Sequence, residues 1–142
     1  MRTYNTLTDI GLLILRTCLG SFMVVGHGWQ KFQTYGEKVD SFADPLGIGS
    51  RLSLTGTVAA EFVCGLLLIV GLLTRVAGAG MAFTMAIAAF VVHRADDFGT
   101  KEKALLYFAG ALALVFTGPG RISIDHLIFG RRRVRDAATP VE

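Results

Sequence analysis

The sequence has little charge, little proline and only two cysteines. Charged residues make up 18% of the 142 residues, whereas a typical soluble domain has about 25%. Cys18 and Cys64 show neither CxxC spacing nor a neighbouring Cys/His cluster, so no structural zinc or iron–sulfur site is predicted. The Gly-x-Gly pairs lack the strand–turn–helix context of a nucleotide-binding fingerprint, and no nucleophile elbow or Ser/His/Asp arrangement is recognisable.

Long apolar runs take the place of these features. The chain is 52% hydrophobic, contains 17 glycines and has a mean hydropathy of +0.54, all typical of a polytopic membrane domain. Four apolar segments are long enough to span a bilayer, the last of them with its flanking lysines included. They cover residues 7–25, 52–73, 76–92 and 104–116. The predicted fold class is an all-α membrane protein, a four-transmembrane-helix antiparallel bundle with a C-terminal interfacial segment.

The basic residues predict the topology. We expect residues 1–130 to form one transmembrane domain and residues 131–142 a basic cytoplasmic tail. The tail cluster favours cytoplasmic termini in the cell (inner) membrane and binding to anionic lipid, not to nucleic acid. Its members are Arg131, Arg132, Arg133 and Arg135. Residues 121–129 alternate apolar and polar side chains, which is typical of a segment lying in the membrane interface.

Two charges lie inside apolar segments. Arg16 interrupts the first and Glu61 the second. A charge at mid-bilayer costs roughly 2.5–3.5 kcal/mol on insertion scales, so it indicates a functional site or a buried pair. Both residues lie about nine positions from their own entry point, which predicts an Arg16–Glu61 ion pair at mid-depth. The pair could serve a site or only fix the helix register. Cys18 lies roughly 200° around the helix from Arg16, so a Cys18–Cys64 disulfide is not expected.

Three further groups are predicted near the outer boundary. His27 ends the first segment, His93 ends the third and Glu102 opens the fourth. We expect them to form the rim of a pocket whose floor is Arg16 and Glu61. No two of the possible ligands have i,i+3 or i,i+4 spacing on one helix, so no metal site is predicted.

Short motifs along most of the chain resemble the DoxX family of small four-helix membrane proteins. They are Leu15-Arg16-x3-Gly20, His27-Gly28-Trp29-Gln30-Lys31-Phe32, Glu61-x3-Gly65, Gly71-Leu72-Leu73-Thr74-Arg75, Glu102-x-Ala104-Leu105-Leu106-Tyr107 and Gly118-Pro119-Gly120-Arg121-x-Ser123-x-Asp125. The resemblance implies a membrane subunit associated with quinone-linked redox systems or with oxidative-stress enzymes. The polar positions that it carries over are Arg16, His27, Lys31, Glu61, Arg75, Glu102, Arg121 and Asp125.

Three functions are compatible with these features. The first is a quinone-interacting subunit of an oxidoreductase system, in which the pocket residues hold the quinone and relay protons. No flavin, haem or iron–sulfur motif is recognisable, so electrons would come from a partner redox protein. The second is a non-enzymatic subunit that docks a soluble redox protein. The third is a small homo-oligomeric transporter, acting as a dimer, with Glu61 as the proton-coupling carboxylate.

Overall fold

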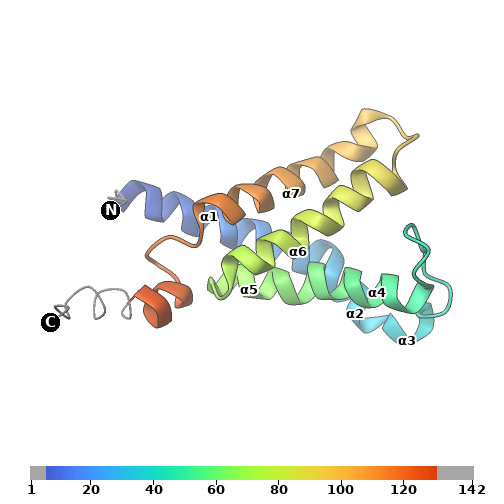
Figure 1. Ribbon diagram of the computed structural model, residues 1–142, viewed down its shortest axis with the longest axis horizontal. Coiled ribbons are helices and arrows are strands. Elements are labelled where there is room, and N and C mark those ends of the chain that lie inside the picture. Colours follow the sequence, from blue (N-terminus) through green and yellow to red (C-terminus); the bar gives the residue numbers. More distant parts are fainter. Residues whose placement is uncertain (1–5, 131–142) are drawn as a thin grey trace, which may run out of the picture.

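The computed structural model describes residues 6–130, and within this range it contains helices but no strand. The elements are α1 (Thr6–Met23), η1 (Val24–Gly28), α2 (Trp29–Gln33), α3 (Tyr35–Lys38), α4 (Ser50–Val58), η2 (Ala59–Val63), α5 (Cys64–Val70), α6 (Thr74–Ile87), η3 (Ala88–Val92), α7 (Phe98–Thr117) and η4 (His126–Gly130). The long helices pack side by side in an antiparallel arrangement, as Figure 1 shows, with α1 against α5 and with α6 against α7.

Three continuous helices are long and apolar enough to cross a membrane, and α7 is the fourth helix of the bundle. The three cover Thr6–Gln33, Ser50–Val70 and Thr74–Val92. The first extends eight residues beyond the predicted end at residue 25, because α1, η1 and α2 form a single rod. The predicted stop after the fourth segment is confirmed: α7 ends at Thr117, and its C-cap residue Gly118 has φ 78° and precedes Pro119. The all-helical fold class is therefore confirmed.

Each of the three membrane-length helices contains one wide π-helical turn. The turns are closed by bonds from the Trp29 N–H to the Val24 carbonyl, from Cys64 to Ala59, and from His93 to Ala88. Each bond spans five residues instead of the four of an α-helix. Such turns re-aim the side chains that follow and are frequent at functional sites.

Glycines allow the helices to approach closely. A Cβ atom on Gly20 would lie 2.5 Å from the carbonyl oxygen of Gly65, and one on Gly28 would lie 2.8 Å from that of Glu61. These contacts hold the first rod antiparallel against η2 and α5. The core between the rods is formed by Leu12, Met23, Leu68, Ala77, Met81, Ala82, Met85, Ala111 and Leu114.

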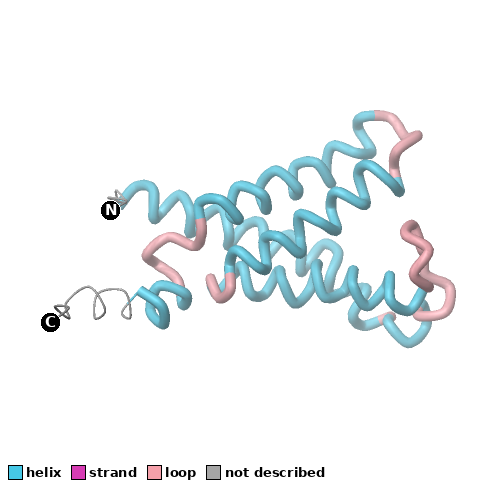
Figure 2. Tube along the Cα trace, in the orientation of Figure 1, coloured by secondary structure: helices cyan, strands magenta, loops and turns pink. Residues whose placement is uncertain are grey.

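Connecting segments gather at the two ends of the bundle (Figure 2). Residues 71–73 and 118–125 lie at the end where α1 begins, which we call the terminal end. Residues 39–49 and 93–97 lie at the opposite end, which we call the loop end. The α6–α7 hairpin packs tightly along its length, whereas α4 diverges from α6 toward the loop end (Figure 1).

Candidate functional site

Arg16 does not pair with Glu61, so the predicted ion pair is wrong. The buried guanidinium donates from Nη1 to the carbonyl oxygens of Leu68 (3.1 Å) and Ile69 (2.7 Å), and from Nη2 to that of Ile122. Both carbonyls of the first pair belong to the last turn of α5, where helical N–H donors run out, and that of Leu68 also accepts a bond from the N–H of the C-cap residue Gly71 (3.2 Å). Arg16 therefore satisfies the C-terminus of α5, where a positive charge is also favoured by the helix dipole.

The axial offset of the two helices explains the error. Gly20 packs against Gly65, and Gly28 against Glu61. These two contacts fix the axial register of the first rod against the antiparallel helix formed by η2 and α5. On this register Arg16 meets Leu68. Glu61 lies seven residues away, about 10 Å along the helix. The predicted spans, residues 7–25 and 52–73, put Arg16 and Glu61 both near the middle of the membrane. The first helix in fact continues to Gln33, so the level of Arg16 differs from that of Glu61.

Asp125 completes the terminal end. Its carboxylate accepts bonds from the Leu73 N–H (2.7 Å) and the Thr74 N–H (2.9 Å), and so caps the start of α6 from a distant part of the chain. Buried Asp9 accepts a bond from the Arg121 N–H (2.8 Å) in the same region. We call Asp9, Arg16 and Asp125 with their backbone partners the terminal-end cluster. Its bonds fasten the segment after α7 to the ends of three helices.

Glu61 has a different partner from the predicted one. Its Oε2 atom lies 2.6 Å from Nζ of Lys31, and their side chains are 7% and 25% exposed respectively. Glu61 lies in η2 and Lys31 in α2, so the pair exists because the first rod continues past residue 25. This ion pair lies toward the loop end, away from the terminal-end cluster.

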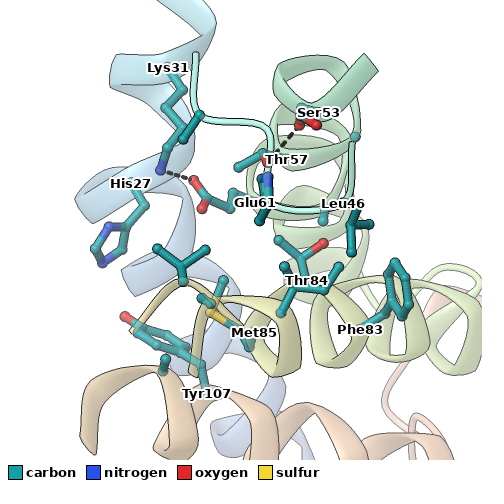
Figure 3. Close-up of a pocket in the computed structure, with 18 of the residues that line it drawn as sticks. His27, Lys31, Leu46, Ser53, Thr57, Glu61, Phe83, Thr84, Met85 and Tyr107 are labelled. Atoms are coloured by element: carbon teal, nitrogen blue, oxygen red, sulfur yellow. Dashed lines mark hydrogen bonds and ion pairs between the residues drawn. The ribbon is translucent and has the colours of Figure 1, made fainter. Parts of the chain in front are cut away.

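The pair borders a cavity of about 780 Å³. Figure 3 shows Lys31, Glu61, His27 and Tyr107 at one end of it, while Phe83 and Leu46 lie at the other. The π-helical turns η1, η2 and η3 all contribute lining residues. The walls are otherwise mainly apolar, and they include Phe42, Pro45, Leu46, Ile48, Leu52, Gly56, Ala59, Ala60, Phe83, Met85, Ile87, Ala88 and Val92.

The structure brings together three of the five predicted pocket residues. His27, Glu61 and His93 line the cavity. Arg16 lies in the terminal-end cluster, and Glu102 is exposed on α7 and does not line the cavity. The His27 ring makes an edge contact with Tyr107, with 6.1 Å between ring centroids. Neither side chain hydrogen-bonds to another residue within the described range 6–130, so both are available to a ligand.

His93 lies at the rim of the cavity and not beside Lys31 and Glu61. Its Nδ1 atom lies 2.7 Å from the Asp96 carboxylate, three residues along the chain. This contact lies within the turn before α7. In the next residue, the Asp97 carboxylate accepts a hydrogen bond from the Thr100 hydroxyl (2.9 Å). That bond, chiefly, lowers the pKa of Asp97 below its ordinary value.

Residues 42–48 cover the cavity at the loop end. Asp44 fixes this segment: its carboxylate accepts bonds from the Gly49 N–H (2.7 Å), the Ile48 N–H (3.0 Å) and the Ser53 hydroxyl (2.7 Å). The Ser53 bond first, and then the backbone bonds, lower the pKa of Asp44. The residues on either side, Phe42 and Leu46 among them, are thereby held over the cavity.

Sequence reasoning did not place Lys31 or Tyr107 in the pocket. Lys31 follows His27 by four residues, so the two share a helix face once the first rod is known to reach residue 33. Tyr107 lies five residues beyond Glu102 within the same motif, on a part of α7 nearer the middle of the bundle. The missing information was the length of the first helix for Lys31 and the axial alignment of α7 for Tyr107.

No group of three or more potential ligands that could hold a metal ion occurs within residues 6–130. Cys18 and Cys64 are both free, as the sequence predicted. The predicted membrane-binding residues Arg131, Arg132, Arg133 and Arg135 lie outside the described residues, and the division of the chain at residue 130 stays a prediction.

These features define a multi-pass membrane bundle with an amphipathic cavity between its helices. The chain belongs to the DoxX family, whose sequence pattern matches residues 11–94. It is 31% identical over 129 residues to "Inner membrane protein YqjF" of Escherichia coli (strain K12), a match that covers 86% of this chain and 95% of that one. It is thus a multi-pass protein of the cell (inner) membrane.

A second relative carries a functional name. The chain is 31% identical over 126 residues to "Putative oxidoreductase CatD" of Bacillus subtilis (strain 168), covering 88% of this chain and 92% of that protein. A Haemophilus influenzae relative named "Uncharacterized protein" is 27% identical over 128 residues, with 85% of each chain covered. No solved structure matches the chain significantly.

Proposed function

We propose that this protein is the membrane subunit of a quinone-linked redox system and that the cavity holds the quinone head. One observation carries the proposal: an apolar cavity of about 780 Å³ has a Lys31–Glu61 ion pair, a histidine and a tyrosine at a single end. The oxidoreductase name of the CatD relative agrees with this class of chemistry.

The residues present fit such a ligand. Pockets for small organic ligands measure about 300–1,000 Å³ and combine apolar walls with a few polar groups that fix orientation. A quinone ring needs apolar packing on its faces and a hydrogen-bond donor for each carbonyl oxygen. Lys31, His27 and Tyr107 supply N–H and O–H donors at the same end of the cavity.

Glu61 has two roles in this proposal. Its carboxylate, 2.6 Å from Nζ of Lys31, holds the ammonium group at the cavity wall. It is also a carboxylate that can hand on a proton where a bound group needs one. A quinone, when bound, accepts two electrons and two protons. The electrons come from a partner redox protein carrying a flavin or metal centre.

The proposal also includes the orientation in the membrane. With both termini in the cytoplasm, the cavity opens toward the outer half of the bilayer and the terminal-end cluster faces inward. The same orientation places the predicted basic tail where a cytoplasmic partner could dock. A cysteine-labelling experiment with a membrane-impermeant thiol reagent on Ser41→Cys tests it, since only an outward-facing loop end reacts in intact cells.

Quinone binding is the direct test of the function. Trp29 is the only tryptophan of the chain, and its ring lies 5.9 Å from that of Phe62, the neighbour of Glu61. Titrating the protein in lipid nanodiscs with a decyl-tailed benzoquinone should therefore quench Trp29 fluorescence saturably. Glu61→Gln should weaken binding roughly 10- to 100-fold, the range of hydrogen bonds involving charged groups.

Glu102→Gln is the matched control. It makes the same substitution at the same end of the bundle, on an exposed side chain outside the cavity. Its affinity should equal that of the unmodified protein. Quenching that never saturates, or that responds equally to both substitutions, would show that the quinone only dissolves in the lipid and that the proposed function is wrong.

A further inference from the structure

The cavity has an opening that faces lipid. Leu52 of α4 and Phe83 of α6 both line it, yet they are 61% and 64% exposed. Both lie within membrane-length helices, and Phe83 lies near the middle of its own. At the depth of Phe83, an exposed apolar side chain contacts acyl chains rather than water, and Leu52 continues the opening toward the loop end. The opening between α4 and α6 therefore lies in the side of the bundle.

The packing of the helices explains this gap. α6 packs against α5, η2 and α7, but α4 has no comparable neighbour and diverges from α6 (Figure 1). Small residues border the gap: a Cβ atom added to Gly56 would meet no atom within 4 Å. Thr84 faces the same space from α6 (Figure 3).

The segment 42–48 lies along the cavity on its loop-end side. Phe42, Pro45 and Leu46 line the cavity there, and the three hydrogen bonds to the Asp44 carboxylate hold this segment in place. The polar groups Lys31 and Glu61 lie at the far end from Phe83 (Figure 3). A ligand with a polar head and an apolar tail therefore fits in one direction, with its tail toward the gap.

We propose that the gap between α4 and α6 is a lateral portal. Through it a lipid-soluble ligand with a long apolar tail enters from the bilayer, and its tail stays between Gly56 and Thr84 while its head meets Lys31 and Glu61. This inference rests on the proposed function and adds the substrate class: a long-tailed lipid quinone, selected by its tail as well as by its head.

A plug in the portal tests the inference. Gly56→Phe places a large side chain in open space on α4, and Thr84→Phe narrows the gap from the other side. Gly11→Phe is the matched control, because Gly11 is also helical with no atom near its Cβ, and it does not line the cavity. Each variant in nanodiscs is titrated with a decyl-tailed benzoquinone and with the same head group lacking a tail, following Trp29 fluorescence.

We expect both plugs to weaken binding of the tailed quinone at least roughly tenfold, as losing two buried methylene groups would. Binding of the tailless head should change less than twofold, and Gly11→Phe should change neither. Plugs that leave the tailed quinone unaffected, or that weaken both probes equally, overturn the portal while the proposed function stands. If the unmodified protein binds neither probe, the proposed function fails and the portal fails with it.

Discussion

The terminal-end cluster and the Lys31–Glu61 pair are two polar sites within one apolar bundle, and they bind different kinds of partner. Arg16 donates to three backbone carbonyls and Asp125 accepts from two backbone N–H groups, so these charges complete helix ends. Among residues 6–130, the Lys31 and Glu61 side chains bind only each other, and both border open space.

The difference separates two reasons for placing a charge in a membrane. The last carbonyls of a helix have no N–H partner within the helix, and a guanidinium can supply the missing donors. A charge in that position has a structural role. A side-chain pair beside a cavity leaves donors and acceptors that a ligand can share. The burial of a charge therefore does not by itself identify a functional site; its partners do.

The largest effect is expected from Arg16→Met. This substitution removes the guanidinium donor from the carbonyl oxygens of Leu68, Ile69 and Ile122. Leu68 keeps its bond from the Gly71 N–H, but each buried group left unsatisfied costs about 1–3 kcal/mol. The free energy of unfolding should fall by more than about 3 kcal/mol, measured by denaturation in mixed micelles. Any Arg16→Met protein that remains folded should bind quinone with unchanged affinity. A large affinity loss in such protein would contradict the separation of the two sites.

A smaller effect is expected from breaking the Lys31–Glu61 pair. Glu61→Gln or Lys31→Met alone leaves one partly buried charge unpaired and should lower the free energy of unfolding by about 1–2 kcal/mol. The double variant should recover most of this loss, because it removes both charges. Quinone binding should stay weak in the double variant as well. Recovery of binding together with stability would show that the pair is structural, like the terminal-end cluster.

The smallest effect concerns the segment over the cavity. The pKa of the Asp44 carboxyl is lower in the folded protein, so its bonds hold the segment at pH values above the ordinary aspartate pKa. That contribution is lost as the pH falls through the folded-state pKa. Hydrogen exchange of the Ile48 and Gly49 amides should thus be slow at neutral pH and faster, relative to other loop amides, in acid. In Asp44→Asn both amides should exchange faster at neutral pH too.

Much of the fold followed from local patterns. The apolar segments predicted the long helices of the bundle, and Gly118-Pro119 predicted the end of α7. The end of the first helix was missed because His27, Trp29 and Lys31 are polar or amphipathic and resemble a loop at a membrane boundary. In the structure they continue the helix, and the π-helical turn at Val24–Gly28 leads into this extension.

The candidate site was only partly predictable for the same reason. His27, Glu61 and His93 were identified from their positions at helix ends or inside apolar runs, and they do line the cavity. Lys31 and Tyr107 join them only after the helices are aligned axially. Asp125 belongs to the terminal-end cluster through contacts with residues about fifty positions away, which no local pattern contains.

The sequence by itself determined the membrane class, the apolar helices and the charges that must find partners within them, because hydropathy and helical periodicity are local properties. The tertiary structure alone decided which partner each charge found. That choice depends on the axial register of two helices, which is set by the contacts of Gly20 with Gly65 and of Gly28 with Glu61. Arg16 and Lys31 lie fifteen residues apart on the first rod, so about four helical turns separate the predicted Arg16–Glu61 pair from the observed Lys31–Glu61 pair.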